Sequence, residues 1–276
     1  MKSIMITGAS SGIGRATAEL FLQSGWRVGL IARRADVLDA IAEKYETAVP
    51  LPTDVTDAEA MEAAFEAFGQ LDVLFNNAGL FGTAGTIDEI DLKDWMQVMN
   101  VNIGGMFIAA RLAFARMRAQ DPQGGRIINI GSMAGKVAMP LNGSYTISKF
   151  GVEAFSDSLR QELQPHGIKV SLVEPGPIAT PMISGAQQQG DSHLARLPPQ
   201  ATQHYGERMA RLLAQLADME RKAPPPAVVV KAVEHALESA RPKTRYVVTR
   251  EAKLLIFLRW LLPDRALDFL LAKMLA

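Results

Sequence analysis

The sequence predicts an α/β protein with one doubly wound parallel sheet of about seven strands and helices on both faces. Apolar runs of strand length alternate with longer segments of helical period. The runs are apolar throughout, which is typical of parallel strands buried on both sides. No change in composition marks a second domain, although 276 residues could form one large core or two small ones.

Seven apolar runs are the expected strands, in the order SIMITGAS, WRVGLIA, AVPLPTDV, LDVLFNNAG, GRIINIGS, IKVSLVEPG and TRYVVT. The first expected helix, GRATAELFLQSG, places Ala16, Leu20 and Phe21 on one face and stops at Gly25. ADVLDAIAEKY follows the second strand. DAEAMEAAFEAF opens with acidic residues, which are favourable at a helix N-terminus. Long helices are expected at about 88–119, 144–164 and 226–240.

Two segments depart from this alternation. Residues 177–225 are polar, rich in Gln and Pro and weakly helical, which predicts a mobile substrate lid on a domain of residues 1–250. Residues 251–276 form an unusually apolar helical extension. Its stretch Leu254–Leu262 is too short to span a bilayer and is interrupted by Arg259. Packing on the domain, a subunit interface and docking to a membrane surface remain open for it.

Composition excludes several classes of protein. The 29 basic residues balance the 29 acidic ones, so no net charge favours nucleic acid. The absence of cysteine excludes disulfides and thiolate chemistry. The four histidines show no metal-ligand spacing, and we therefore expect no metal site. The chain runs from Met1 directly into a strand, and we expect a cytoplasmic protein.

The stretch TGASSGIG, Thr7 to Gly14, lies where the first strand meets the first helix. Glycine allows a tight turn and a close approach of the backbone to a diphosphate. The helix that begins near Ile13 aims unpaired N–H groups at the same anion. The spacing G-x-x-x-G-x-G differs from the common G-x-G-x-x-G pattern. A glycine-rich turn without a ligand is the alternative.

Together with five further motifs, this loop resembles the short-chain dehydrogenase/reductase family, a group of Rossmann-like oxidoreductases. The resemblance extends from Ile4 to about Thr249 and follows the family's order. The motifs are Thr7–Gly14, NNAG at 76–79, Asn102, Ser132, Tyr145 with Lys149, and PGPIAT at 175–180. The resemblance implies a nicotinamide cofactor and a carbonyl or alcohol substrate.

The end of the second strand indicates which cofactor is bound. An NAD site places a carboxylate there for the ribose 2′-hydroxyl, but this strand ends LIARRAD, with Ala32 at that position. Arg33 and Arg34 follow, and guanidinium groups bind a 2′-phosphate well. Arg15 adds positive charge nearby. We therefore expect NADP(H) rather than NAD(H), with Arg33 as the main contact; a surface arginine pair without a ligand is the alternative.

Tyr145 and Lys149 are four residues apart and share one face of a helix. A free phenol titrates near a pKa of about 10, and a nearby ammonium group is expected to lower this value. The family resemblance implies that Tyr145 is the general acid/base and that Lys149 lowers its pKa and holds the nicotinamide ribose. It further implies that Ser132 hydrogen-bonds the substrate oxygen and that Asn102 bends a helix and holds a water.

The remaining expected contacts also follow from the resemblance. Asp54 and Val55 are expected at the adenine and Thr180 at the carboxamide. The full expected cofactor site is Gly8, Ser10, Ser11, Gly12, Ile13, Gly14, Arg33, Arg34, Asp54, Val55, Asn77, Ala78, Gly79, Tyr145, Lys149, Pro175, Gly176, Ile178 and Thr180. Apolar residues beside these motifs predict a hydrophobic substrate pocket, or are only core packing: Met133, Met139, Leu141 and Met182.

Two functions remain. The first is an NADP(H)-dependent oxidoreductase for a hydrophobic carbonyl or alcohol, working as a homodimer or homotetramer. The second is a sensor or scaffold protein that binds NADP(H) without turnover, which the complete set of serine, tyrosine, lysine and asparagine disfavours.

Overall fold

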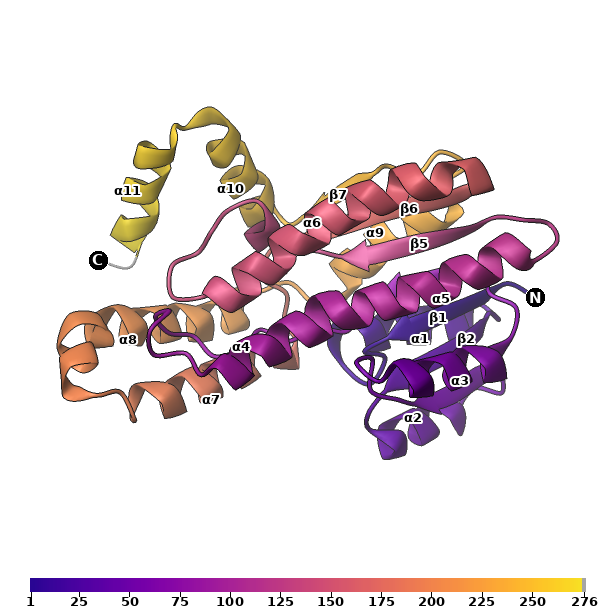
Figure 1. Cartoon of the computed structure of the whole chain (residues 1–276), viewed down its shortest axis with the longest axis horizontal. Helices are drawn as coiled ribbons and strands as arrows, with labels where there is room; N and C mark the ends of the chain where they lie inside the picture. The colour runs from indigo at the N-terminus through magenta and orange to yellow at the C-terminus, as the bar shows by residue number, and fades with distance from the viewer. Residues whose placement is uncertain (275–276) are drawn as a thin grey trace.

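The computed structural model describes residues 1–274 and contains one seven-stranded sheet of parallel strands (Figure 1). All seven apolar runs form strands, which confirms the predicted sheet. The strands are β1 (Ser3–Thr7), β2 (Arg27–Ala32), β3 (Ala48–Pro52), β4 (Val73–Asn76), β5 (Gly125–Ile130), β6 (Ile168–Pro175) and β7 (Arg245–Val248). Their order in the sheet is β3-β2-β1-β4-β5-β6-β7.

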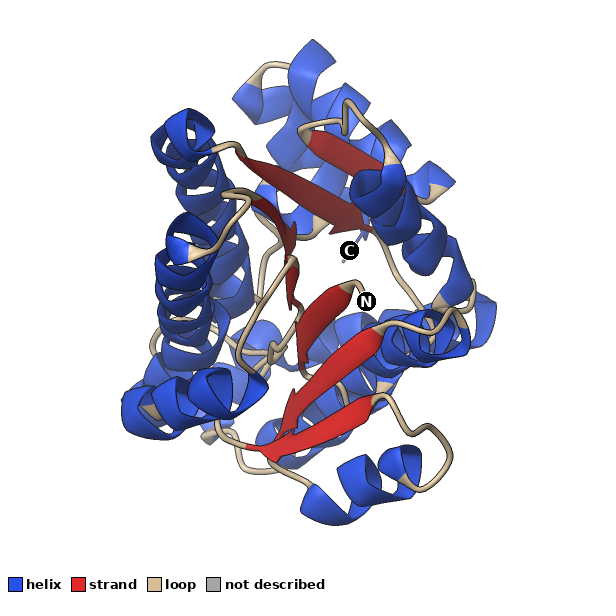
Figure 2. Ribbon diagram, turned by 90° about the vertical axis from the view of Figure 1, so that its right-hand side faces the viewer, coloured by secondary structure: helices blue, strands red, loops and turns tan. Residues whose placement is uncertain are grey.

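Helices connect the strands and cover both faces of the sheet (Figure 2). The connecting helices are α1 (Gly12–Gln23), α2 (Ala35–Ala42), α3 (Ala58–Phe68), α4 (Leu92–Met99), the π-helix η1 (Asn100–Gly105), α5 (Met106–Ala119), the short η2 (Met133–Gly135), α6 (Gly143–Leu163), η3 (Gln164–His166) and α9 (Ala227–Glu238). The long helix expected near 88–119 is formed by α4, η1 and α5 together, and those expected near 144–164 and 226–240 are α6 and α9.

Neighbouring side chains along each strand enter two separate cores. Ile4 and Ile6 of β1 pack with α1, α2 and α9, whereas Met5 packs with α3, α5 and α6 on the other face. In β4, Phe75 packs in the same core as Ile4 and Ile6, whereas Leu74 packs in the same core as Met5. Since successive side chains of a strand point to opposite faces, a strand covered on both sides is apolar at most of its positions.

The strand order reverses between β1 and β4, because β2 and β3 lie on one side of β1 and β4 to β7 on the other. Ligands of doubly wound sheets bind at such a switch point, outside the carboxyl ends of the strands. The glycine loop follows β1, and NNAG follows β4. The fold therefore brings these two motifs together.

The predicted lid is more ordered than its composition indicated. We expected a weakly helical segment, but the chain forms α7 (Pro181–Leu194) and the 24-residue α8 (Pro199–Lys222). Pro181 and Pro199 lie in the first turns of these helices, where a missing N–H costs little. One face of α8 buries Met209, Leu212, Leu213 and Leu216. In Figure 1 the two helices lie side by side at the end of the molecule where α4 and α6 begin.

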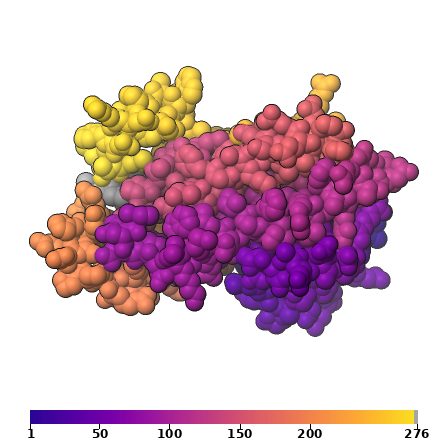
Figure 3. All heavy atoms as spheres, in the orientation of Figure 1, coloured from indigo at the N-terminus to yellow at the C-terminus, as the bar shows by residue number. Residues whose placement is uncertain are grey.

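The apolar extension forms a helical hairpin of α10 (Arg250–Leu261) and α11 (Asp264–Met274), and its last two residues lie outside the described chain. Leu267 and Leu271 of α11 pack on Val137, in the loop after η2. This contact supports packing on the domain. Large apolar side chains of α10 nevertheless remain exposed, among them Trp260 at 79%. In Figure 3 the hairpin covers one corner of the molecule.

One continuous helical run, residues 92–119, is long and apolar enough to cross a membrane. It comprises α4, η1 and α5. Its α5 part buries Ala109, Ala113 and Met117 against the sheet. We therefore interpret the run as a core helix of the domain.

Candidate active site

The glycine loop has a backbone that only glycine accommodates well. Gly8 and Gly12 have φ angles of 69° and 55°, in the left-handed region that other residues rarely adopt. A Cβ atom on Gly14 would lie 2.3 Å from the Gly8 carbonyl oxygen. The loop therefore requires glycine at these positions to turn into α1.

The NNAG segment holds this loop from the neighbouring strand. The backbone N–H groups of Asn77 and Ala78 donate to the Thr7 hydroxyl at 2.9 and 3.0 Å. The Asn77 side-chain amide donates to the Thr7 carbonyl at 3.0 Å. Asn77 thus has a clear role in the loop's structure, apart from the cofactor contact expected of its segment.

The start of α1 suits a diphosphate. The N-cap residue Ser11 makes no side-chain hydrogen bond to the first turn, so the turn's N–H groups are not capped by it. Thr180 approaches from the PGPIAT segment, with its methyl group 3.1 Å from where a Cβ on Gly12 would lie. A side chain at Gly12 would fill this narrow gap. The residues present therefore fit a dinucleotide that runs along the loop toward Thr180.

The two arginines after β2 have different surroundings. The Arg34 guanidinium donates to the carbonyl and hydroxyl oxygens of Ser10, both at 3.0 Å. Arg33 is exposed and has no hydrogen bond or ion pair with any described residue. Arg15 pairs with Glu19 at 2.9 Å, which offsets its charge. Arg33 is therefore the arginine best able to bind a further anion.

At the expected adenine end, Asp54 is already partly engaged. One of its carboxylate oxygens accepts from the backbone and hydroxyl of Thr56. Val55 is buried against Gly105, where a Cβ would lie only 2.6 Å from the valine side chain. Ile178 is buried in the core, with Ile13 packed against the same cluster. Pro175 ends β6, and a Cβ on the following residue, Gly176, would collide with the Thr249 hydroxyl.

Ser132, Tyr145 and Lys149 come together at the carboxyl end of β5. Ser132 follows this strand and hydrogen-bonds the Tyr145 phenol. The Lys149 ammonium lies 5.6 Å from the centroid of the Tyr145 ring and donates to the Ile130 carbonyl at 2.9 Å. All three side chains are buried. Spacing on one helix face therefore predicted the neighbourhood of tyrosine and lysine correctly.

The expected lowering of the Tyr145 pKa is wrong in direction. Burial raises the pKa of Tyr145 above its ordinary value, although the hydrogen bond with Ser132 acts in the opposite direction. Burial also lowers the pKa of Lys149 to about 8. Desolvation penalises both charged forms, and sequence spacing gives no measure of it.

Asn102 lies in the π-helix η1, consistent with the expected irregularity of this helix. Its side-chain oxygen accepts from the backbone N–H of Leu80 at 2.7 Å. Its amide donates to the Leu80 carbonyl and the Ser148 hydroxyl, both at 2.9 Å. Asn102 thereby joins the segment after NNAG to the helix that carries Tyr145 and Lys149.

Phe81 is a site residue that the sequence analysis missed. Its ring stacks on Tyr145, with centroids 4.8 Å apart and an interplanar angle of 29°. It also packs on Ile183 of α7 and Leu216 of α8. A single aromatic residue two positions after NNAG was the only signal for it.

The four expected pocket residues have different surroundings. Leu141 packs with Ala84 and Leu212 of α8 and has a φ of 61°, which is rare outside glycine. The Met182 methyl lies 3.8 Å from where a Cβ on Gly79 would lie. Met133 begins η2, directly after Ser132. Met139 packs on the cluster that includes Leu267 of the C-terminal hairpin.

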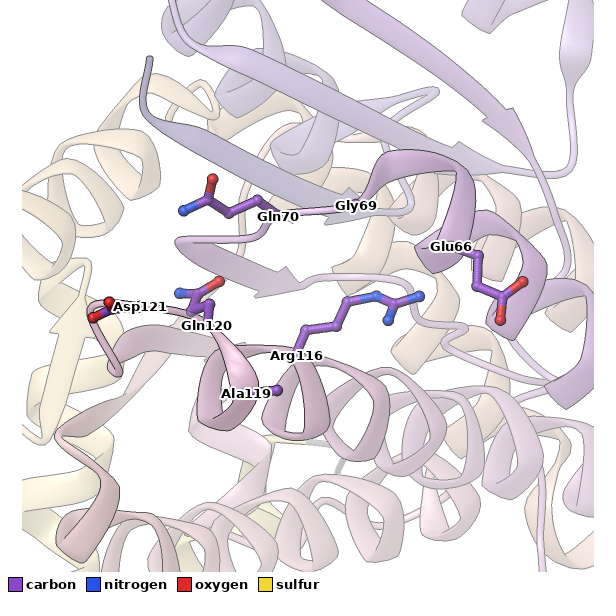
Figure 4. A pocket seen from close by; sticks show the side chains of 7 residues that line it. All are labelled: Glu66, Gly69, Gln70, Arg116, Ala119, Gln120 and Asp121. Carbon is purple, nitrogen blue, oxygen red and sulfur yellow. The ribbon is translucent and has the colours of Figure 1, made fainter.

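A surface hollow of about 560 Å³ lies elsewhere (Figure 4). Its lining residues include Gln70 and Asp121, which precede β4 and β5, and Arg116 of α5. It therefore lies toward the amino ends of the strands, away from the catalytic candidates.

Comparison with known proteins decides the family. The model of the short chain dehydrogenase family matches residues 2–191. The chain belongs to the short-chain dehydrogenase family. It is therefore an oxidoreductase acting on CH–OH or C=O groups with a nicotinamide cofactor.

Individual short-chain dehydrogenases resemble the chain over nearly its whole length. The NADPH-dependent 3-dehydrocapnine reductase of Ornithobacterium rhinotracheale is 33% identical, with 97% of this chain and 95% of the relative covered. Retinol dehydrogenase 5 of Mus musculus is 35% identical, with coverage of 97% and 87%. A short-chain dehydrogenase/reductase from Burkholderia phymatum, solved with NAD, is 25% identical with a TM-score of 0.79, covering 97% of this chain and 95% of its own.

Proposed function

We propose that this short-chain dehydrogenase is an NADP(H)-dependent reductase or dehydrogenase for a hydrophobic carbonyl or alcohol, with Tyr145 as its general acid/base. The observation that supports this most is the buried cluster of Ser132, Tyr145 and Lys149, at the same carboxyl edge of the sheet as the glycine loop. Family membership alone would leave the roles of these residues open.

The bound nicotinamide supplies or accepts the hydride. During reduction, Tyr145 gives its phenolic proton to the substrate oxygen, and during oxidation it takes the proton back. Ser132 hydrogen-bonds the same oxygen and polarises the carbonyl group. Lys149 stabilises the phenolate and binds the nicotinamide ribose. Asn102 holds the π-helix against the helix of Tyr145 and contributes to a water path toward Lys149.

The positive charge after β2 supports NADP(H) as the cofactor. Arg33 is exposed and unpaired among the described residues, and Ala32 offers no carboxylate to repel a 2′-phosphate. One relative is named as NADPH-dependent, whereas one solved neighbour contains NAD. In this proposal Arg33 contacts the 2′-phosphate directly and Arg34 supports Ser10 in the loop.

The surroundings of Tyr145 support a hydrophobic substrate. Phe81 covers the tyrosine ring, and α7 and α8 close over Phe81 with aliphatic side chains such as Ile183 and Leu213. One relative is named for retinol, a largely hydrocarbon alcohol. In this proposal the lid of residues 177–225 opens for the substrate and then excludes water.

The test is a panel of alcohols and carbonyl compounds of increasing hydrocarbon length, each assayed by nicotinamide absorbance with NADP(H) and with NAD(H). The proposal expects turnover to improve with hydrocarbon size and to favour NADP(H). Cofactor binding without turnover across the whole panel would support a sensor or scaffold protein instead.

We further propose that the enzyme works in the cytoplasm as a homodimer or homotetramer. Phe107 of α5 and Ile147 and Phe150 of α6 are 53%, 50% and 43% exposed. Burying them against a second copy would remove apolar surface from water. Sedimentation analysis tests this: the Phe150→Glu variant should dissociate, and a monomeric parent protein would contradict the proposal.

A further inference from the structure

A cluster of five charged side chains lies beside the catalytic candidates and has no part in the proposed chemistry. We call Lys136, Glu153, Asp157, Glu174 and Arg245 the charged cluster. Its members come from four parts of the chain: the loop after η2, helix α6, strand β6 and strand β7.

Two basic side chains of the charged cluster bridge its acidic ones. Lys136 lies 2.5 Å from Glu153 and 3.7 Å from Glu174. Arg245 lies 3.0 Å from Glu153, 2.6 Å from Asp157 and 4.0 Å from Glu174. The side chains of Glu174 and Glu153 are only 0% and 9% exposed, so these charges are largely removed from water.

The hydrogen bonding of the two glutamates is incomplete within the described part of the chain. Both carboxyl oxygens of Glu174 and Oε1 of Glu153 are buried without a hydrogen-bond donor among residues 1–274. Ionised carboxylates only accept hydrogen bonds, so two of them in contact cannot satisfy each other. Burial and the Glu153 carboxyl raise the pKa of Glu174 to about 8, against the opposing effects of Lys136 and Arg245. One proton between the glutamates would supply the missing donor.

We propose that Glu153 and Glu174 share one proton, and that this carboxyl pair positions the Ser132 loop against the helix that carries Tyr145 and Lys149. Both glutamates are positioning residues, since neither touches the reacting atoms. The effect on turnover rests on the proposed function, whereas the shared proton does not.

The connections of the pair support the positioning role. Glu153 lies one turn after Lys149 on α6, and Glu174 directly precedes Pro175. Lys136 ends the short loop that Ser132 begins. The loop approaches α6 so closely that a Cβ on Gly135 would lie 2.8 Å from the Lys149 carbonyl oxygen. Separating the two carboxyl groups would therefore shift the Ser132 loop relative to the catalytic helix.

The charged surroundings determine how the pair responds to pH. Lys136 faces it from the loop, Arg245 from β7, and Asp157 from α6, where Asp157 also pairs with Arg160. Lys149, on the same helix, donates to Ile130. Loss of the shared proton would place two adjacent carboxylates in a buried site, and their repulsion would loosen the pair.

Infrared spectroscopy of the full-length protein at about pH 6 tests for the shared proton directly. This pH lies between 4.5, the ordinary pKa of a glutamate, and about 8. The wild type should show the carbonyl band of a protonated carboxylic acid. The band should disappear in Glu174→Gln and persist in Glu62→Gln, which alters an exposed carboxylate on α3. A wild type without the band, or a Glu174→Gln variant that keeps it, overturns the shared proton.

Unfolding equilibria give a second, independent readout. Between pH 4.5 and about 8 the folded state holds a proton that the unfolded state has released, so stability falls as pH rises. Relative to Glu174→Gln, the wild-type unfolding constant should rise about tenfold per pH unit in this window. If the ratio of the wild-type and Glu174→Gln unfolding constants does not change with pH, the shared proton is overturned.

Kinetics test the positioning role. Glu174→Gln keeps a hydrogen-bond donor and should retain most of the turnover at neutral pH. Because it has no shared proton to lose, its turnover should not fall at alkaline pH as that of the wild type should. Glu174→Leu should lower kcat about tenfold, equivalent to about 1.4 kcal/mol, with little change in the KM of the cofactor. A folded Glu174→Leu variant with wild-type kcat overturns the positioning role, even where the infrared band establishes the proton.

Discussion

The Phe81 ring lies face to face with the Tyr145 ring, with centroids 4.8 Å apart. It joins the proposed acid/base to the lid helices, because it also packs on Ile183 and Leu216. This stack contributes to the burial that raises the pKa of Tyr145. It also brings an aromatic ring next to the point where we propose that the substrate carbonyl binds.

Replacing Phe81 by alanine is expected to lower kcat/KM for small apolar substrates about tenfold, because the site loses apolar contact area and admits water. The loss of kcat/KM should be smaller for bulkier substrates, since they can fill the space that the Phe81 ring leaves. The measurement is kcat/KM across a series of ketones. Phe257→Ala, at an exposed position on α10, is the control. An equal loss of kcat/KM for substrates of all sizes would show that Phe81 does not determine substrate specificity.

Replacing Arg33 by alanine is expected to weaken NADPH binding at least about tenfold and to leave NADH nearly unchanged. A hydrogen bond to a charged group contributes about 1.5–3 kcal/mol, and only NADPH carries the 2′-phosphate. Arg34→Ala should weaken both cofactors, since Arg34 supports Ser10. Fluorescence titration with each cofactor measures this. An unchanged ratio for Arg33→Ala would shift the preference to NAD.

Because Lys149 is buried, its contribution to the free energy of unfolding should depend on pH. Its pKa is lowered from 10.5 to about 8, so between these values the unfolded state binds a proton that the folded state lacks. The lysine's contribution to stability should therefore rise with pH across this window. Urea unfolding of the wild type and Lys149→Met at about pH 7 and pH 10 measures the difference. A contribution that falls with pH would show that the ammonium is stabilised in the fold.

Replacing Asn102 by alanine is expected to cost about 1–3 kcal/mol of stability, because the backbone N–H and C=O of Leu80 and the Ser148 hydroxyl lose their partner. Turnover should fall more than cofactor affinity, since the residue joins η1 to the helix of Tyr145. Denaturant midpoints and kcat are the measurements. A variant of normal stability and turnover would make this hydrogen-bonded link dispensable.

The sheet could be predicted because buried parallel strands are apolar at most of their positions, and the runs around Ile6 and Phe75 fit that pattern. The helical structure of the lid could not be predicted, because its polar overall composition obscures the apolar face of α8. Phe81 lies far from Tyr145 in sequence, so their stack has no local pattern. Glu174 has a signal in the sequence, since a lone acid within an apolar strand requires a buried partner.

The direction of the Tyr145 shift shows what spacing cannot provide. Two residues four apart on a helix are neighbours, but the pKa of each depends on how much water the whole fold removes. Burial prevails here over the hydrogen bond with Ser132. In the proposed mechanism, the Lys149 ammonium and the positive charge of an oxidised nicotinamide would both lower the pKa of Tyr145 during catalysis.

The central claim is that Tyr145 transfers the proton, and Tyr145→Phe tests it most directly because it removes one hydroxyl and keeps the ring that stacks on Phe81. The measurement is kcat with the best substrate of the panel, alongside the dissociation constant of NADPH. We predict that turnover is abolished while NADPH binds as in the wild type. Full activity in this variant would contradict the assignment of Tyr145 as the general acid/base.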